Sequence, residues 1–561
     1  MKKIKYIALA SVFSLGMTSC GDFGDLNIDP EHLNEANVPF EMVFSNAQHQ
    51  ALGSDWDMWR TGCIYSAQWT QQLTSIDWWD GYGRYNYSDG YSASFWDTFS
   101  GDRGAMRDVT TCYDKWKDQK GLEIDWNMAR VMRIYAFAKM SDLYGDIPYT
   151  EAGRPKEFSY PKYDSQESIY KGMLKELDEA QAKLASGKAA MGVQDLYYKG
   201  DAAQWKKFAN SLMLRLAMRL VKVDPTTAKT YAAKAYANGV ITDVADNAKL
   251  DHAGGVTTND SSEPFAKINA SEDREFFLSK TFVDMLKQAN DPRLSLIGTT
   301  VSKKDLISVQ DGWQEDDFGD MTAEKQEGIL SGGYSLNPTS PYAIAKVDPR
   351  FGRTPENIVE YKERKADDGS VKKEPVYWYS RYTRYFSIPN RYTYSDPTAP
   401  TFIITAAQTN FLLAEAAIRG YISGDAKTFY ENGVKAAFKQ FTQFPNAGKV
   451  YNKYLPEGAV EKYLKENPFE VAKALEQINT QYYITTFGDP HEVFANWRRS
   501  GFPVLAPAAM AKQDGQCATD GSIPRRFRYP SSESQVNKAN YDAAVSRQGG
   551  DTFSTRVWWD K

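Results

Sequence analysis

Long segments with apolar residues at helical spacing predict that this chain is built mainly from helices. In the clearest of them the apolar positions follow at intervals of three and four residues and so share one face: Phe208, Ala209, Leu212, Met213, Leu216 and Leu220. A second apolar face, formed by Leu214, Ala217 and Met218, predicts a helix that is packed on both sides. A similar pattern over residues 128–138 predicts a helix that ends near Gly145, before Pro148.

Paired helices are expected nearer the end of the chain. Residues 411–419 are rich in Ala and Leu, a break follows at 420–424, and Asp425 is suited to be the N-cap of the next helix. A further helix over 471–482 is expected to end before Gly488. Two helices joined by a short turn are the unit of tetratricopeptide (TPR) repeats, although the spacing here is not regular enough to establish such repeats by itself.

The middle of the chain has a different composition. Residues 254–400 are rich in Gly, Pro, Asp, Ser and Thr and contain only short strand-like runs, such as 376–379. So much irregular chain between helical segments indicates either a functional insertion or a partly mobile segment. We interpret it as a loop-rich cap on the helical scaffold.

Charge and aromatic content restrict the kinds of partner. The net charge of −5 and the sequence pI near 5.7 argue against nucleic acid, because a phosphate-binding surface needs a basic excess. Phe, Trp and Tyr make up 14% of the residues although the mean hydropathy is −0.56. Tyr and Trp have an apolar face and a polar edge, so this excess fits a half-wet binding surface as well as a core.

The first residues indicate export and lipid anchoring. A basic start is followed by a short apolar run at 6–15, which has the length of a signal-peptide core rather than of a membrane span. Small residues then lead into Cys20, which resembles the lipobox of bacterial lipoproteins, with Met17 in place of the usual Leu. The acidic stretch at 21–25 resembles the surface-export signal of Bacteroidetes lipoproteins. This implies a signal peptide over 1–19, lipidation of Cys20 and a protein that is anchored in the membrane without spanning it.

The remaining cysteines and the histidines do not suggest a disulfide scaffold or a metal centre. Cys63, Cys112 and Cys517 are few for an exported chain of this size, and one disulfide among them stays an open question. They are isolated in sequence, as are the four histidines, so we expect no zinc site. We expect no cofactor, while a calcium ion bracing the cap is left open.

Several motifs, taken together and in order, resemble the SusD-like branch of the SusD/RagB family. They are DLYGDIPY (142–149), NDPRL (290–294), AEAA before RG (414–420), WRRSGFP (497–503) and IPRRFRYP (523–530). The Arg-rich motifs are expected to clamp helix ends and loops by stacking and by charge-assisted hydrogen bonds. They therefore identify the family without marking a ligand site.

The resemblance implies a mostly α-helical fold with four TPR-like hairpins and an irregular cap. One SusD-like domain would cover 20–561, divided into an N-terminal helical scaffold (20–253), the cap (254–400) and a C-terminal helical scaffold (401–561). The implied function is not catalytic. The protein would bind an oligosaccharide at the outer surface of the outer membrane and deliver it to a SusC-like TonB-dependent transporter.

The densest aromatic stretch is the candidate ligand site. Large rings in a polar, Gly-containing loop suit sugar recognition, because the rings cover the C–H faces of a sugar while polar side chains pair with its hydroxyls. The candidate residues of this stretch are Asp77, Trp78, Trp79, Asp80, Tyr82, Arg84, Tyr85 and Tyr87, and those of the middle segment are Trp313, Tyr334, Asn337 and Trp378. Phe95 and Trp96, which follow at helical spacing, are expected in the core.

Other functions remain as alternatives. The same scaffold could carry peptides, or it could be a structural subunit whose Trp78 and Trp79 contact the transporter. A hydrolase is disfavoured because His491-Glu492 lacks the second His of a zincin motif and Gly81-Tyr82-Gly83 lacks the third Gly of a dinucleotide loop. No Gly-x-Ser-x-Gly or Walker sequence is present. A glycosidase needs only two carboxylates a few ångströms apart, and the sequence does not exclude such a pair.

Overall fold

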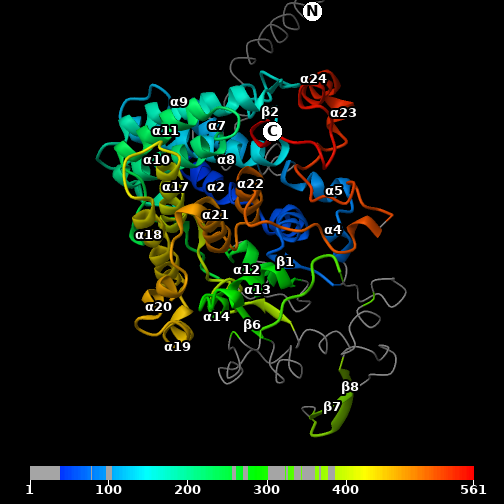
Figure 1. Ribbon diagram of the computed structural model, residues 1–561. Coiled ribbons are helices and arrows are strands. Elements are labelled where there is room, and N and C mark those ends of the chain that lie inside the picture. Colours follow the sequence, from blue (N-terminus) through cyan, green and yellow to red (C-terminus); the bar gives the residue numbers. More distant parts are fainter. Residues whose placement is uncertain are drawn as a thin grey trace, which may run out of the picture.

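The computed structural model describes residues 38–76, 79–96, 104–254, 261–269, 276–300, 323, 326–333, 343, 360–365, 368–376, 386–513 and 515–561. Over these residues the chain is mostly helical, and its short strands pair two by two (Figure 1). None of the helices in these ranges has the length and apolar character needed to cross a membrane.

Helices α2 to α11 form the first half. Their bounds are α2 (Phe40–Gln50), α3 (Asp55–Asp57), the π-helix η1 (Met58–Ala67), α4 (Asp80–Gly83), α5 (Asp89–Ser92), α7 (Ala105–Trp116), α8 (Glu123–Tyr144), α9 (Gln166–Lys183), α10 (Ala202–Arg219) and α11 (Pro225–Asn238). The middle contains α12 (Pro264–Asn269), α13 (Lys280–Gln288) and α14 (Leu294–Ile297). The last part contains α17 (Ala406–Ile418), α18 (Ala426–Lys439), α19 (Tyr451–Tyr454), α20 (Ala459–Glu466), α21 (Ala474–Thr485), α22 (Pro490–Ser500), α23 (Glu533–Val536) and α24 (Lys538–Gln548).

The strands are β1 (Leu73–Thr74), β2 (Ile147–Pro148), β3 (Tyr163–Asp164), β4 (Ala248–Leu250), β5 (Phe277–Leu278), β6 (Gly298–Thr300), β7 (Glu360–Lys365), β8 (Val371–Val376), β9 (Ser387–Pro389) and β10 (Thr401–Ile404). They form the antiparallel pairs β1–β5, β2–β3, β4–β10, β6–β9 and β7–β8. Because β4 pairs with β10, the chain entering the middle segment and the chain leaving it are held side by side.

Successive helices pack against their neighbours as hairpins. In the upper left of Figure 1, α7 packs on α8, α8 on α9, α9 on α10 and α10 on α11. In the later part α17 packs on α18 and α21, and α21 packs on α22. Contacts of α10 with α17, and of α22 with α8 and η1, join the two parts, so one continuous core runs through the scaffold.

The helices follow the periodicity from which they were predicted. In α10 both predicted faces are buried, from Phe208 through Met218. α8 ends at Tyr144 as expected, because Gly145 takes a φ of 88° that only glycine adopts readily. Asp425 is the N-cap of α18, and its carboxylate accepts the backbone N–H of Thr428 at 2.9 Å.

The described part of the middle segment contains a helix that its composition did not predict. α13 is a nine-residue helix, with Phe282, Val283 and Leu286 buried on one face, that the sequence analysis did not anticipate. Its apolar positions do have helical spacing, but they lie in a short run among polar residues. Of the strand-like run at 376–379, Val376 is the last residue of β8, and 377–379 lie outside the described residues.

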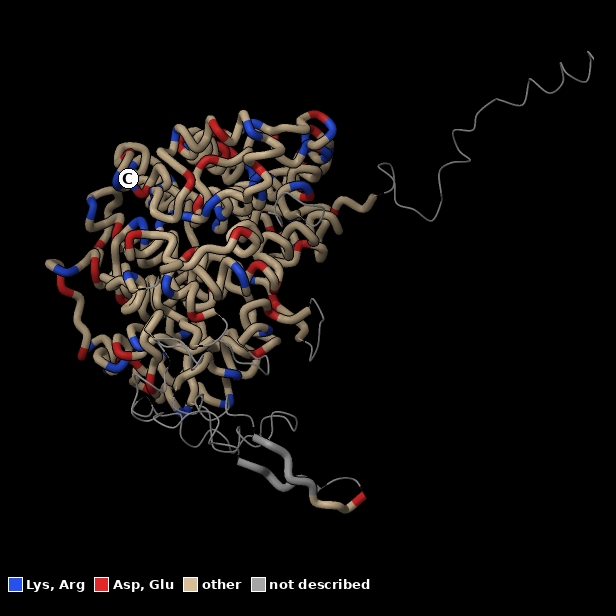
Figure 2. Tube along the Cα trace, turned by 90° about the vertical axis from the view of Figure 1, so that its right-hand side faces the viewer, with Lys and Arg blue, Asp and Glu red and all other residues tan. Residues whose placement is uncertain are grey.

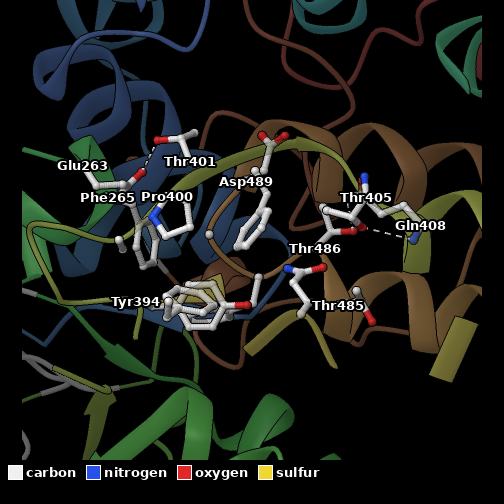
Figure 3. A pocket seen from close by; sticks show the side chains of 16 residues that line it. Glu263, Phe265, Tyr394, Pro400, Thr401, Thr405, Gln408, Thr485, Thr486 and Asp489 are labelled. Atoms are coloured by element: carbon white, nitrogen blue, oxygen red, sulfur yellow. Dashed lines mark hydrogen bonds between the residues drawn. The ribbon is translucent and has the colours of Figure 1, made fainter. Parts of the chain in front are cut away.

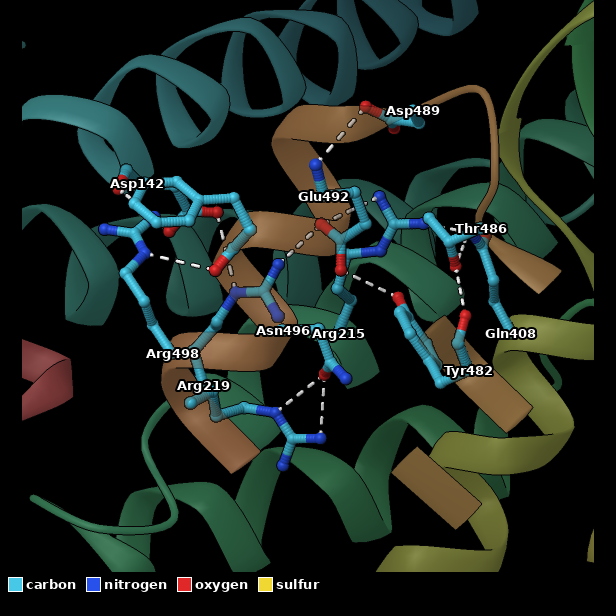
Figure 4. A network of polar contacts seen from close by, with 12 residues as sticks. Asp142, Arg215, Arg219, Gln408, Tyr482, Thr486, Asp489, Glu492, Asn496 and Arg498 are labelled. Carbon is cyan, nitrogen blue, oxygen red and sulfur yellow. Dashed lines mark hydrogen bonds and ion pairs between the residues drawn. The ribbon is translucent and has the colours of Figure 1, made fainter. Parts of the chain in front are cut away.

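The arginines of the family-like motifs connect helices and loops inside the protein, as expected. Arg499 donates to both carboxylate oxygens of Glu415 at 2.7 Å. Arg498 donates to the backbone carbonyls of Asp142 and Arg525, and Arg219 reaches Glu492 at 2.5 Å in the network of Figure 4. These groups are almost completely buried, and a charge in such a place needs its partner. The motifs therefore hold the helices together.

The remaining cysteines are thiols. Cys112 and Cys517 are both free, so the three cysteines after Cys20 form no disulfide with one another.

Candidate functional site

Five aromatic rings from four neighbouring elements gather on one side of the N-terminal half. They come from α3, η1, α4, α5 and the residue before α4: Trp56, Trp59, Trp79, Tyr82 and Tyr91. We call these rings the aromatic patch. Trp56 is 56% exposed and the other four are partly buried against the core. Contiguous apolar patches at a protein surface often mark binding sites.

The backbone around the patch presents the rings outward. A capping box starts α3, in which the backbone N–H of Asp57 donates to the Ser54 hydroxyl at 3.3 Å and the Ser54 N–H donates to the Asp57 carboxylate at 3.0 Å. The chain then continues as the π-helix η1, whose wider turns are rare and occur mostly at functional sites. The junction of α3 and η1 places Trp56 and Trp59 side by side.

The rings contact one another mostly edge to face. Trp59 lies at the centre, with ring centroids 5.5 Å from Trp56 and 4.9 Å from Trp79. Tyr91 lies 6.1 Å from Trp59, 5.5 Å from Trp79 and 5.4 Å from Tyr82. Such contacts contribute about 0.5–1.5 kcal/mol per pair beyond the burial of area, so the patch is a preformed surface.

The patch also offers polar atoms. Burial, with Tyr91 close by, raises the pKa of Tyr82 above its ordinary value, so its hydroxyl stays protonated at neutral pH and can both donate and accept. Arg60 of η1 lies among the rings, with its guanidinium carbon 5.1 Å from the centroid of Trp56 and 5.9 Å from that of Tyr91. Ring faces with hydrogen-bonding groups at their edges are the combination that sugar recognition needs.

Two of the predicted site residues, Trp79 and Tyr82, belong to the patch. Asp80 and Arg84 form an ion pair of 3.0 Å with each other. Tyr85 is 1% exposed, and its hydroxyl accepts the backbone N–H of Ala508 at 2.7 Å, so its ring belongs to the core.

Tyr87 lies partly buried beneath the guanidinium of Arg528, 4.2 Å from its ring, and its hydroxyl donates to Asp89 at 2.7 Å. Phe95 and Trp96 are core residues, as expected, with 0% and 3% exposure. The stretch is also less loop-like than predicted, because α4 and α5 each form one helical turn. The other predicted residues lie outside the described residues: Cys20, Asp77, Trp78, Trp313, Tyr334, Asn337 and Trp378.

Sequence reasoning missed Trp56, Trp59 and Arg60. The available signal was Asp55-Trp56-Asp57-Met58-Trp59-Arg60, with two Trp residues three apart between polar residues. That spacing is typical of a helix face packed in a core. Only the fold shows that these rings meet Trp79 and Tyr91 at the surface.

Two further cavities fit a glycan less well. The pocket of Figure 3, between Glu263, Thr401, Tyr394 and Asp489, has room for about 20 Å³, enough for one water molecule. A cleft of about 320 Å³ is lined by Met106, Met140, Phe158 and Val536 among others. Its one Trp, Trp96, is buried. The exposed ring that lines this cleft is Phe158, at 36% exposure, whereas the aromatic patch brings five rings together.

Metal binding has no evident place in the described part of the chain. Over those residues, no three His, Cys, Asp or Glu side chains gather as a metal ion would require. The charged residues are also spread out, since Figure 2 shows Lys and Arg interspersed with Asp and Glu along the trace.

Comparison with known proteins finds two matching family models. One, described as "Starch-binding associating with outer membrane", matches residues 33–335, and the other, described as "Susd and RagB outer membrane lipoprotein", matches residues 369–560. No curated protein matches the chain.

Solved structures match over nearly the whole chain. A chitin-binding protein and a Bacteroidetes AC2a SusD-like protein each have a TM-score of 0.74 and 27% identity, over 93% of this chain and 100% of theirs. A SusD homologue from Bacteroides uniformis has a TM-score of 0.68 over 93% of this chain and 99% of its own. Its identity of 21% bears on the fold alone.

Proposed function

The chain belongs to the SusD/RagB family of outer-membrane lipoproteins, and from this premise we propose that it binds an oligosaccharide or polysaccharide fragment at the cell surface. The aromatic patch would hold the sugar, and a SusC-like TonB-dependent transporter would receive it. The observation that carries this proposal is the exposed ring of Trp56, continuous with Trp59, Trp79 and Tyr91. A match to a chitin-binding protein at 27% identity supports the ligand class.

Sugars have a shape that suits aromatic rings. A pyranose has apolar C–H faces and hydroxyls around its rim, so it gains burial against a flat ring without losing the hydration of its hydroxyls. The rings of the patch are braced against one another and lose little conformational freedom on binding. The site is mainly apolar with few polar groups, and we assign it no catalytic residues. The proposed role is binding and transfer without a chemical reaction.

Binding isotherms of the mature chain without Cys20 against a panel of glycans and peptides test the proposal. The wild type is expected to bind one glycan class, and Trp56→Ala/Trp59→Ala is expected to weaken binding at least about tenfold, as loss of apolar burial worth about 1.5–3 kcal/mol implies. Tyr160→Ala is the matched control, because Tyr160 is 64% exposed and lies outside the patch.

Other outcomes point to other functions. Binding of peptides and of no glycan would replace the sugar by a peptide as the ligand. If neither class binds, and the double variant loses the transporter in a pull-down, the patch serves the transporter interface.

A further inference from the structure

Among the described residues, Arg60 is the cation that lies over the rings of the aromatic patch. It lies on η1, partly buried, with its guanidinium carbon over the rings of Trp56 and Tyr91 at 5.1 and 5.9 Å. Stacking on aromatic rings holds a guanidinium in place and still leaves its N–H groups available for bonding in the ring plane. Arg60 therefore lies within reach of any sugar that covers Trp56.

The carboxylates that the structure describes on α3, α4 and α5 have other partners. Asp55 pairs with Lys267 at 2.6 Å, and Asp80 pairs with Arg84 at 3.0 Å. Asp57 accepts the hydroxyls of Ser54 and Ser94 at 2.6 and 2.9 Å. On α5, Asp89 accepts the hydroxyls of Tyr87 and Ser531 at 2.7 Å each.

Arg60 itself has no such partner. Over the described residues it forms no ion pair and no hydrogen bond, and its Nε is buried without an acceptor. Burying an N–H group without an acceptor costs about 1–3 kcal/mol, so the free protein carries a penalty here that an incoming acceptor would remove. A carboxylate or sulfate, which pairs with the planar guanidinium in two parallel hydrogen bonds, suits this position best.

We infer that the glycan bound by the patch is acidic and that Arg60 receives its carboxylate or sulfate group. This inference rests on the proposed function. The sugar ring would cover Trp56, and the anionic substituent would lie in the plane of the guanidinium. Arg60 would then select acidic over neutral glycans, while the rings would contribute to the binding of both.

The test pairs each acidic glycan with its neutral counterpart. Oligosaccharides of polygalacturonate, alginate and hyaluronate are titrated beside their carboxyl-reduced forms, and a carrageenan oligosaccharide beside its desulfated form. The wild type is expected to bind at least one acidic member about tenfold or more tightly than its neutral form, as charge-assisted hydrogen bonds of 1.5–3 kcal/mol imply. The pair that responds shows whether the group is a carboxylate or a sulfate.

Variants separate the charge from the rings. Arg60→Gln is expected to remove the preference, so that the variant binds the acidic member and the neutral member about equally. Arg60→Lys keeps a positive charge but lacks the planar guanidinium. Its preference for the acidic member should lie between that of the wild type and that of Arg60→Gln. Trp56→Ala/Trp59→Ala should weaken both members alike. Thermal unfolding of each variant shows that the fold is retained.

The outcomes distinguish this inference from the proposed function. If the patch binds glycans but prefers neutral ones, or if Arg60→Gln weakens both members equally, the inference is wrong and the proposed function stands. If no glycan binds, both are wrong. Raising NaCl from about 50 to about 300 mM should weaken binding of the acidic member by the wild type and not by Arg60→Gln.

Discussion

At the scale of single residues, buried charges and polar groups connect the helices of this chain. The carboxylate of Glu415 in α17 accepts hydrogen bonds from Nη1 and Nη2 of Arg499 in α22. It also accepts one from Nε of Arg419 at 2.8 Å. These arginines hold the pKa of Glu415 at about 2, below its ordinary value, even though burial acts in the opposite direction. The carboxylate is therefore ionised in the fold at every pH that proteins usually meet.

Glu415→Ala is expected to lower the free energy of unfolding by about 3–5 kcal/mol, because it leaves the buried charge of Arg499 without its partner. Asp542→Ala is the matched control. Asp542 pairs with Lys538 at 2.7 Å, but its side chain is 52% exposed, so the expected change is about 0.5 kcal/mol or less. Urea denaturation measures both. Equal effects of the two substitutions would contradict the role given to Glu415.

Glu263 provides a prediction about pH. Burial raises the pKa of Glu263 to about 7, although the backbone N–H of Ala266 and the hydroxyl of Thr401 donate to its carboxylate. A folded pKa above the unfolded one means that this group favours the fold at low pH and that its contribution is lost as the pH rises through about 7.

Glu263→Gln is therefore expected to remove a decline in stability of the order of 2–3 kcal/mol between about pH 5 and pH 8. Urea denaturation of the wild type and the variant at several pH values measures this difference, with the exposed Glu461→Gln as control. If the free energy of unfolding depends on pH in the same way for the wild type and for Glu263→Gln, the prediction is wrong.

Local sequence could predict part of the candidate site at this scale. Trp79 and Tyr82 were identified because they lie in a dense aromatic stretch. Tyr85 and Tyr87 were identified for the same reason, yet the fold turns the ring of Tyr85 into the core and places Tyr87 beneath Arg528. Density of rings in a sequence says nothing about which rings face water, because exposure depends on elements far away in the chain.

At the scale of elements, a glycine that ends a helix and a glycine inside a helix differ in backbone conformation and in the space around them. Gly145 ends α8 with a φ of 88°, and a Cβ there would lie 1.9 Å from the side-chain oxygen of Gln548. Gly172 lies on the exposed face of α9, where a Cβ would meet nothing within 4 Å.

The two glycines should respond in opposite ways to the same substitution. Gly145→Ala should destabilise the fold by at least about 1 kcal/mol, through backbone strain and the clash with Gln548. Gly172→Ala should stabilise it by about 0.5–1 kcal/mol, because alanine restricts the unfolded chain and favours the helix. Thermal unfolding checks both. A stabilising Gly145→Ala would contradict the assigned end of α8.

Long helices were predictable and short or unusual ones were not. α8, α10, α18 and α21 repeat their apolar spacing over three or more turns. The π-helix η1 has no sequence pattern of its own, and the arrangement of Trp56 and Trp59 depends on it. This is why Trp56 and Trp59 were missed.

At the scale of the whole molecule, the scaffold holds the patch in a fixed position. η1 packs on α22, α3, α4 and α5, so the rings belong to the rigid N-terminal half. The lipid anchor proposed at Cys20 lies outside the described residues. It would attach this half to the membrane through the segment before α2.

Cys20→Ser tests the proposed anchor. The variant lacks the thiol that would carry the lipid, so it is expected to lose incorporation of labelled fatty acid and to leave the membrane fraction for the soluble one. Cell fractionation measures this directly. Unchanged membrane retention and labelling would exclude Cys20 as the lipidation site.

The most direct measurement for the central claim is a crystal structure of the mature chain with the glycan selected by the binding panel. Our account predicts a sugar ring on Trp56 and Trp59, with further contacts to Trp79, Tyr82 or Tyr91. Glycan density in the 320 Å³ cleft beside Phe158, or anywhere else with the aromatic patch empty, would contradict it.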